Sequence, residues 1–120
     1  MLLGEVYAPN CVVKAMGLNA YLVSPGRSCF VEIETVDHLG NLITVGGQSN
    51  AFTLAVKNRL HPSPWQPIDI QVHDLENGTY EVFYSMNNIG IFDMHFQYKN
   101  TTIPSQMCVS VLTSGFLSAL

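Results

Sequence analysis

Residues 72–82 decide the fold, and they read Val-His-Asp-Leu-Glu-Asn-Gly-Thr-Tyr-Glu-Val. Apolar and polar side chains alternate on both sides of Asn77-Gly78, as they do in two strands joined by a tight turn. Asparagine and glycine both tolerate a positive φ, so this pair predicts the turn itself. Tyr80 starts the next strand, where its ring can be buried while its hydroxyl reaches the backbone. The stretch therefore predicts a turn and a sheet corner.

The same two-residue period continues in both directions along the chain. Turn residues separate short alternating stretches, and in each stretch one row of side chains is mainly apolar. The rows expected to face the core are Cys29, Val31, Ile33 and Thr35; Phe52, Leu54 and Val56; Ile68, Ile70 and Val72; Tyr80, Val82 and Tyr84; Phe92, Met94, Phe96 and Tyr98; and Met107, Val109 and Val111. The pattern predicts an all-β domain with two sheets packed face to face and no helix of useful length.

The composition limits what the chain can do. It has 120 residues, 48% of them hydrophobic and 12% charged, so we expect one domain with one core. The net charge of −4 argues against nucleic-acid binding, which needs a clustered basic face. No apolar run reaches the roughly 18 residues of a membrane span, and residues 1–4 lack the features of a signal peptide. We therefore expect no membrane insertion by this domain and favour a cytoplasmic location, with the extracellular face of a membrane protein as the alternative.

The stretch 72–82 resembles the Asp-x-x-x-Gly-Thr-Tyr-x-Val signature of filamin-type immunoglobulin-like repeats. Further landmarks of that family occur at similar spacing: Gly17-Leu18; Val31, Ile33, Asp37 and Gly40; and Tyr84, Gly90 and Phe92. The resemblance covers residues 8–112, leaving an N-terminal extension at 1–7 and a C-terminal tail at 113–120. It implies an immunoglobulin-like antiparallel β-sandwich of about seven strands. Such repeats occur in filamins, in tripartite-motif ubiquitin ligases and in plant gamete adhesion proteins.

Two departures from the family pattern indicate a divergent member. The closing Gly-Ser-Pro-Phe of the family is matched only by Ser105-Gln106-Met107, and the connection at residues 60–67 is longer. Both departures argue against a repeat of an actin cross-linker.

No pattern in the sequence indicates catalysis, a cofactor or a metal site. No pair among the four histidines has a strong ligand spacing, and His73 and His95 fall on outward strand positions. The nucleophile-elbow, phosphate-loop and paired-carboxylate constellations do not occur. We therefore expect a domain that is not an enzyme and holds no cofactor.

The cysteines and the sequons leave the compartment open. Cys29 falls in an inward row, where a free cysteine behaves as a small apolar residue. In filamin-type repeats the strands that correspond to Cys11 and Cys108 are neighbours, so the resemblance also allows a disulfide between these two residues. Sequons begin at Asn77 and Asn100, both on expected hairpin tips that a glycan can reach.

The resemblance implies how a protein partner binds. Filamin-type repeats accept an extended peptide beside a sheet edge, where backbone groups supply affinity and alternating side chains supply specificity. The acceptor edge is expected at Phe52, Thr53, Leu54, Ala55, Val56 and Lys57, and the gap beside it is lined by Ile68, Ile70 and Val72. The alternative is that these apolar residues belong only to the core.

Trp65 lies among three prolines, at positions 62, 64 and 67. Proline fixes φ and has no N–H, so this segment cannot form a central strand. Two interpretations of Trp65 stay open: it caps the open end of the core, or it is an exposed anchor for a partner.

Three functions are compatible with these observations. The first is an interaction, scaffold or spacer module of a larger multidomain protein. The second is an extracellular cell-adhesion domain of the gamete-attachment type, which the sequons and a disulfide favour. The third is an accessory domain of an enzyme such as a ubiquitin ligase. The identity of the partner and the oligomeric state are not indicated by the sequence.

Overall fold

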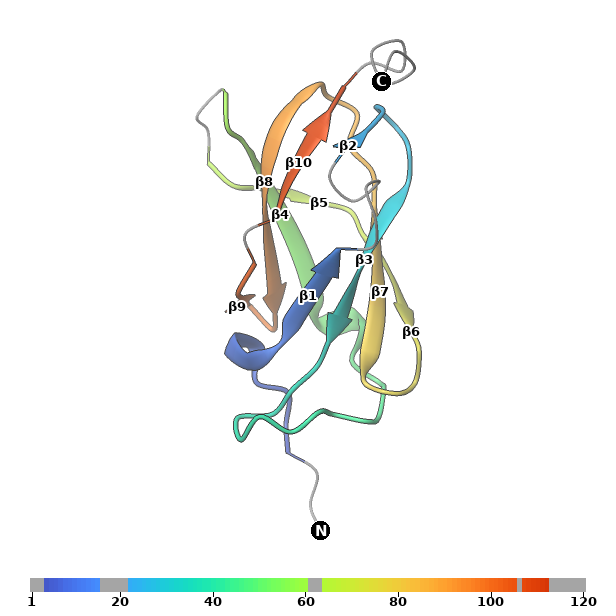
Figure 1. The fold of residues 1–120 in the computed structure, drawn as a ribbon, viewed down its shortest axis with the longest axis vertical. Coiled ribbons are helices and arrows are strands. Elements are labelled where there is room, and N and C mark those ends of the chain that lie inside the picture. The colour runs from blue at the N-terminus through green and yellow to red at the C-terminus, as the bar shows by residue number, and fades with distance from the viewer. Residues whose placement is uncertain (1–3, 16–21, 61–63, 106, 113–120) are drawn as a thin grey trace.

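Two β-sheets face each other in a computed structural model of the chain, which describes residues 4–15, 22–60, 64–105 and 107–112 (Figure 1). The four-stranded sheet has the order β1-β3-β7-β6. The six-stranded sheet has the order β2-β10-β8-β4-β5, and β9 also pairs with β8. The strands of the first sheet are β1 (Val12–Ala15), β3 (Cys29–Glu34), β6 (Gln71–Asp74) and β7 (Thr79–Tyr84). Those of the second are β2 (Leu22–Val23), β4 (Phe52–Asn58), β5 (Gln66–Ile68), β8 (Gly90–Tyr98), β9 (Thr101–Ile103) and β10 (Cys108–Val111).

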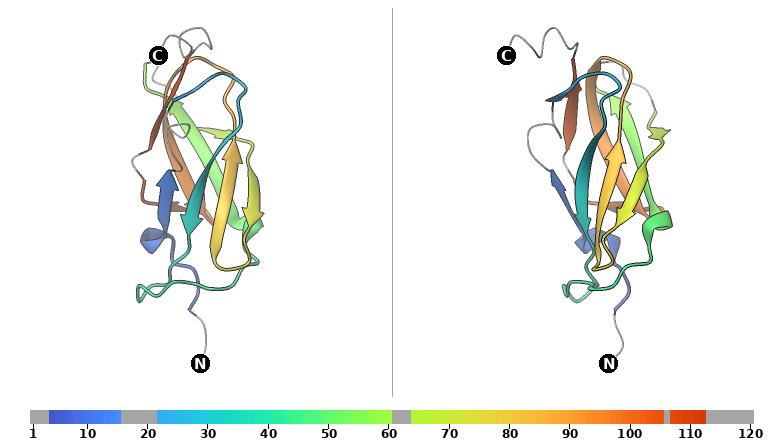
Figure 2. Two further views of the ribbon diagram at one scale, coloured as in Figure 1. Left: turned by 45° about the vertical axis from the view of Figure 1, so that its right-hand side comes forward. Right: turned by 90° about the vertical axis from the view of Figure 1, so that its right-hand side faces the viewer.

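The predicted all-β sandwich is confirmed. Neighbouring strands are antiparallel except β2 and β10, which are parallel. Figure 2 shows the two layers from two further sides, with β6 beside β7 at the margin of the four-stranded sheet. Five of the six expected rows each correspond to one strand, namely β3, β4, β7, β8 and β10, and the sixth spans β5 and β6. The strands β1, β2 and β9 add to this set.

The core lies between the sheets, where the predicted rows meet. All the expected inward residues of β3, β4, β7, β8 and β10 are buried. Phe52 joins the two layers, because its ring centroid lies 4.9 Å from that of Tyr80 and 5.5 Å from that of Tyr98. Burying one such aromatic side chain stabilises the fold by about 1.5–3 kcal/mol.

The prediction of one continuous strand from Ile68 to Asp74 is wrong. The chain leaves the six-stranded sheet at Ile68, the end of β5, and enters the four-stranded sheet at Gln71, the start of β6. Ile68, Ile70 and Val72 still pack against the core, although each is only half-buried. The apolar alternation therefore continues through the crossing between sheets, which explains why the sequence does not reveal the break.

A long connection from β3 to β4, residues 35–51, runs around one end of the sandwich (Figure 1). It includes a single bridge between Val36 and Leu42 and ends in the short 3₁₀ helix η3 (Ser49–Ala51). A further 3₁₀ helix among the described residues, η1 (Ala8–Asn10), precedes β1. Neither helix has the length or the apolar character to cross a membrane, and the described residues contain no other helix that does.

Candidate functional site

The stretch 72–82 holds the β3–β4 connection against the β6–β7 turn. The Asp74 carboxylate accepts a hydrogen bond from the Gly47 N–H at 2.7 Å. The Tyr80 hydroxyl accepts one from the Gln48 N–H at 3.1 Å, as expected for a corner tyrosine that reaches the backbone. Burial raises the pKa of this hydroxyl, and the hydrogen bond from Gln48 opposes that shift. These contacts give the signature a structural role.

The turn itself differs from the expected two-residue form. Four residues, 75–78, connect β6 to β7, and the positive φ values fall at Glu76 (62°) and Gly78 (90°) instead of at Asn77. The Gly78 carbonyl accepts hydrogen bonds from the N–H and the hydroxyl of Thr35, at 3.0 and 2.6 Å. A Cβ atom on Gly78 would lie 1.8 Å from the carbonyl oxygen of Ile43. Glycine is therefore required both by the backbone angle and by the close approach of the β3–β4 connection.

The expected acceptor edge at Phe52–Lys57 is covered, because β4 lies between β8 and β5. The Arg59 N–H donates to the carbonyl of Ile91 at 2.8 Å, in continuation of the β4–β8 ladder. Hydrogen-bonded pairs alternate along an antiparallel ladder, so Leu54 and Val56 direct their N–H and C=O groups away from β8. Those groups face β5, which pairs with both residues. In this structure β4 is an inner strand.

β5 is itself a poor template for another strand. Pro67 is its middle residue and pairs with Ala55 of β4. Leu54 and Val56 direct their backbone groups toward β5, whereas those of Ala55 point toward β8. Ala55 and Pro67 are therefore a non-hydrogen-bonded pair, and the backbone groups of Pro67 face away from β4. Proline has no N–H to donate, so an edge strand tolerates it where the backbone nitrogen faces away from the neighbouring strand, as it does at Pro67. The outer edge of β5 therefore lacks a donor at its centre.

β6 has an open edge in the described part of the chain. It pairs with β7 on one side and with no other described strand. The Leu75 N–H donates to the Thr79 carbonyl at 3.1 Å, which fixes the alternation of the β6–β7 ladder. Val72 and Asp74 consequently direct their backbone N–H and C=O groups away from β7. These groups are available to an added strand.

The seam between β5 and β6 contains the predicted gap residues. Ile68, Ile70 and Val72 are half-buried along it. Two hollows, of about 390 and 370 Å³, adjoin the seam where the chain crosses from β5 to β6, and both are lined by Asp69 and Ser85. The other end is bounded by η3, which lies beside β6. The seam thus combines an open backbone edge with a partly exposed apolar row.

Trp65 does not cap the core, so the first interpretation of this residue is wrong. Its side chain is 43% exposed and lies outside the buried cluster. It rests on the outer face of the six-stranded sheet, with its ring centroid 5.2 Å from that of His95 and 6.0 Å from Nζ of Lys57. The small side chain of Ala55, which faces outward between β5 and β8, leaves room for this arrangement.

The chain matches the Filamin/ABP280 repeat over residues 5–106. The chain belongs to this family. Members are immunoglobulin-like domains without catalytic function and serve as interaction or spacer modules. The crystal structure of the Lin-41 filamin domain matches 89% of this filamin repeat and 96% of its own chain, with a TM-score of 0.65 and 15% sequence identity. That similarity supports the fold alone. No curated protein sequence matches the chain.

All three cysteines of this filamin repeat are free thiols, so the predicted disulfide between Cys11 and Cys108 is absent. Cys11 precedes β1 in the four-stranded sheet, whereas Cys108 begins β10 in the six-stranded sheet, and these strands do not pair. The Cys11 thiol instead donates to the carbonyl of Tyr7 at 3.5 Å. Burial raises the pKa of Cys11 and of Cys29, which disfavours the reactive thiolate.

The outward positions predicted for His73 and His95 are confirmed. Nδ1 of His73 lies 2.9 Å from the Glu81 carboxylate, and Nε2 of His95 lies 2.9 Å from the Thr102 hydroxyl. Within the described ranges, no three His, Cys, Asp or Glu side chains converge as a metal site would require. Several residues used in the sequence interpretation lie outside the described residues, namely Gly17, Leu18, His61, Pro62 and Gln106.

Both predicted glycosylation sites lie on exposed turns of the filamin repeat. Asn100 lies with Lys99 in the two-residue turn between β8 and β9, and their φ values are 66° and 46°. Asn77 uses its side-chain oxygen to accept the Thr79 N–H at 3.0 Å. Asn100 is therefore the less constrained of the two side chains.

The sequence interpretation missed the charged neighbours of Trp65. Lys57 and Asp93 are directly opposite each other on β4 and β8, and Arg59 forms an ion pair with Asp93. Because side chains alternate between the two faces along β4 and β8, Lys57, Asp93 and His95 lie on the outer face of the six-stranded sheet. The strand register that brings them together depends on long-range pairing.

Proposed function

We propose that this filamin repeat is a protein-interaction module that takes up an extended partner segment along the free edge of β6. One observation carries the proposal: the backbone groups of Val72 and Asp74 face away from β7, and no described strand pairs with them. Edge pairing supplies backbone hydrogen bonds of about 0.5–1.5 kcal/mol each. A few such bonds, together with apolar contacts, are sufficient for a modular interaction.

The seam beside β6 supports a preference for apolar side chains in the partner. Side chains of an added strand alternate between the two faces of the sheet. Those on the inner face would lie over Ile68, Ile70 and Val72, which are half-buried and already contact the core. The proposed partner segment therefore carries an apolar side chain at every second position.

The residues Phe52–Lys57 take part only if β5 is displaced, because β5 occupies the outward groups of Leu54 and Val56. A partner strand on β4 would have to break those hydrogen bonds before forming its own. Addition to β6 breaks no strand pairing, and this difference is why we assign the acceptor role to β6.

A substitution at Val72 tests the proposal. Peptides that bind the folded domain are first selected from a random library. Val72→Pro removes the outward N–H of β6 without removing a donor to β7, so it should abolish binding while the domain stays folded. Val72→Thr is the matched control, because it retains the N–H and the β-branched shape, and it should bind.

Amide chemical-shift mapping of the selected peptides identifies the edge directly. The proposal requires the largest shifts at residues 71–74. Shifts centred on residues 54–56 and 66–68 would instead show displacement of β5, and shifts away from both strands would refute strand addition at this seam.

The position of Asn100 favours a second candidate, an extracellular adhesion domain. Asn100 is exposed at the tip of the β8–β9 turn, a position that a glycan can reach. Expression through the secretory pathway should then give a mass increase that a glycosidase removes and that Asn100→Gln abolishes. An unmodified Asn100 in secreted protein would eliminate this candidate.

A further inference from the structure

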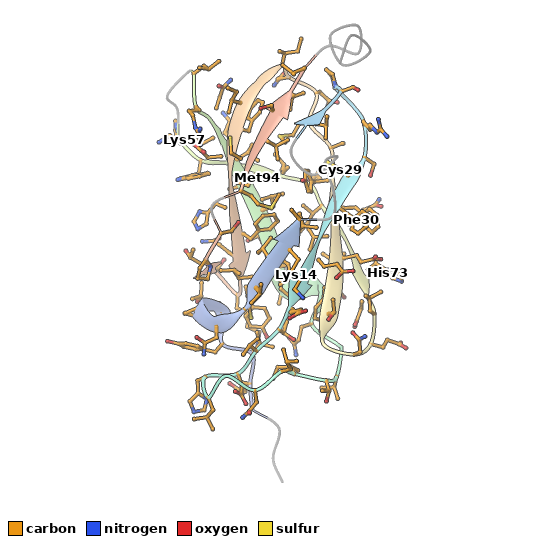
Figure 3. The ribbon with its side chains drawn as sticks, viewed as in Figure 1. Lys14, Cys29, Phe30, Lys57, His73 and Met94 are labelled. Carbon is orange, nitrogen blue, oxygen red and sulfur yellow. The ribbon has the colours of Figure 1, made fainter. Side chains whose placement is uncertain are left out.

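A hollow lies on the outer face of the six-stranded sheet, away from the β5–β6 seam. It measures about 680 Å³. Met94 and Met107 also border it, although both belong to the buried core and are only 4% and 8% exposed. Trp65 and His95 form an aromatic wall on one side. In Figure 3, Lys57 lies on the left of the view near Met94, whereas His73, beside the seam, lies on the right.

The described lining of this hollow carries a small excess of positive charge in an acidic protein. Among the described residues it includes two cations, Lys57 and Arg59, and one carboxylate, that of Asp93. The whole chain has five Lys and Arg residues against nine Asp and Glu residues. Arg59 is neutralised by its ion pair with Asp93. Lys57 forms no ion pair among the described residues, and its ammonium group lies above the Trp65 ring.

Trp65 belongs to a residue type that often contributes strongly to binding energy at protein interfaces. Tryptophan is enriched among interface hot spots, and Trp65 remains 43% exposed although it contacts two neighbours. These two contacts, with the His95 ring and with Nζ of Lys57, restrict the indole ring. A restricted, partly exposed indole loses less conformational entropy than a free one when a partner covers it.

We propose that this hollow is a second docking site, which binds an acidic segment of a partner protein. Charge complementarity specifies the occupant: a carboxylate of the segment pairs with Lys57, and an adjacent apolar side chain covers the exposed part of Trp65. The net charge of −4 opposes non-specific binding of such a segment to the rest of the chain. The site differs from the proposed β6 edge in position and in the partner chemistry that it selects.

The test uses the single tryptophan of the chain as a built-in probe. The peptide Glu-Glu-Leu-Glu-Glu is titrated into the protein at low ionic strength, while the Trp65 indole N–H signal and fluorescence are followed. Both should change saturably, and the peptides Gln-Gln-Leu-Gln-Gln and Lys-Lys-Leu-Lys-Lys should produce no such change. Added salt should weaken binding, because the hollow is open to solvent.

Charge-matched variants separate this site from general electrostatics. Lys57→Glu should weaken binding of the acidic peptide about tenfold or more. Arg27→Glu makes the same change in net charge at an exposed position outside the hollow, and it should retain most of the affinity. Circular dichroism confirms that each variant is folded.

Three results would overturn the proposal. The first is equal binding of the acidic and uncharged peptides. The second is an equal loss of affinity in Lys57→Glu and Arg27→Glu. The third is a Trp65 signal that changes with protein concentration alone, which would identify a second copy of the chain as the occupant.

Discussion

Replacement of Gly78 by alanine tests whether the β3–β4 connection is locked onto the β6–β7 turn. Gly78 has a φ of 90°, and its missing Cβ would overlap the Ile43 carbonyl oxygen at 1.8 Å. Gly40 is the matched control, because its φ is 87° and an added Cβ would meet nothing within 4 Å. Both substitutions place an alanine at the same unfavourable positive φ. Only Gly78→Ala also forces the β6–β7 turn away from Ile43 in the β3–β4 connection.

The magnitudes follow from these contacts. A left-handed alanine costs about 1–2 kcal/mol, and the stiffer unfolded chain offsets about 0.4–1 kcal/mol of that cost. Gly40→Ala should therefore destabilise the domain by about 1 kcal/mol. Gly78→Ala must also separate the turn from Ile43, which disrupts the two hydrogen bonds from Thr35, each contributing about 1 kcal/mol. Its total cost should be about 3 kcal/mol.

Urea unfolding followed by tryptophan fluorescence and circular dichroism measures both free energies of unfolding. In thermal scans the expected difference of about 2 kcal/mol corresponds to a shift of roughly 8 °C between the two variants. Equal destabilisation of Gly78→Ala and Gly40→Ala would refute the reasoning, because it would show that the Ile43 contact is not needed for stability.

Three further predictions concern single side chains. Tyr80→Phe removes the acceptor for the Gln48 N–H and should lower the free energy of unfolding in urea by about 1 kcal/mol; an unchanged value would mean that water replaces the bond. Trp65→Ala should leave the calorimetric Tm almost unchanged, whereas a large drop would restore the core-capping interpretation. The pKa of Asp37 is lowered chiefly by the Asn41 N–H, so its stabilising effect is complete above the ordinary carboxyl pKa of 3.8 and is lost as pH falls through the lower folded value. The Tm difference between wild type and Asp37→Ala should therefore be constant near neutral pH and close in acid, and a difference that persists in acid would contradict this assignment.

The buried rows could be predicted from the sequence because strand side chains alternate with a period of two. The rows beginning at Cys29, Phe52, Tyr80 and Phe92 are buried in the structure as expected. The signature at residues 72–82 also identified the family, because its turn and corner tyrosine have fixed local spacing.

The crossing between sheets and the strand edges could not be predicted in the same way. Ile68, Ile70 and Val72 keep the period of a single strand although β5 and β6 belong to different sheets. The presence of Pro67 argues against a central strand in this segment. No local sequence pattern, however, indicates that β5 pairs with β4. The outer-face cluster of Lys57 and Trp65 likewise depends on that pairing. Edges and outer faces are set by which strands become neighbours, and that information is not contained in a local pattern.

The pairing of β5 with β4 also bears on the solubility of the chain. Residues 52–56, Phe-Thr-Leu-Ala-Val, are uncharged, rich in β-forming residues and free of proline and glycine, which is the composition of segments that assemble into fibrils. In the folded domain β8 and β5 occupy both sides of this segment, and Pro67 closes the outer side to further pairing. β5 therefore covers the free side of an aggregation-prone segment, and we expect local unfolding of β5 to expose that segment to pairing with other chains.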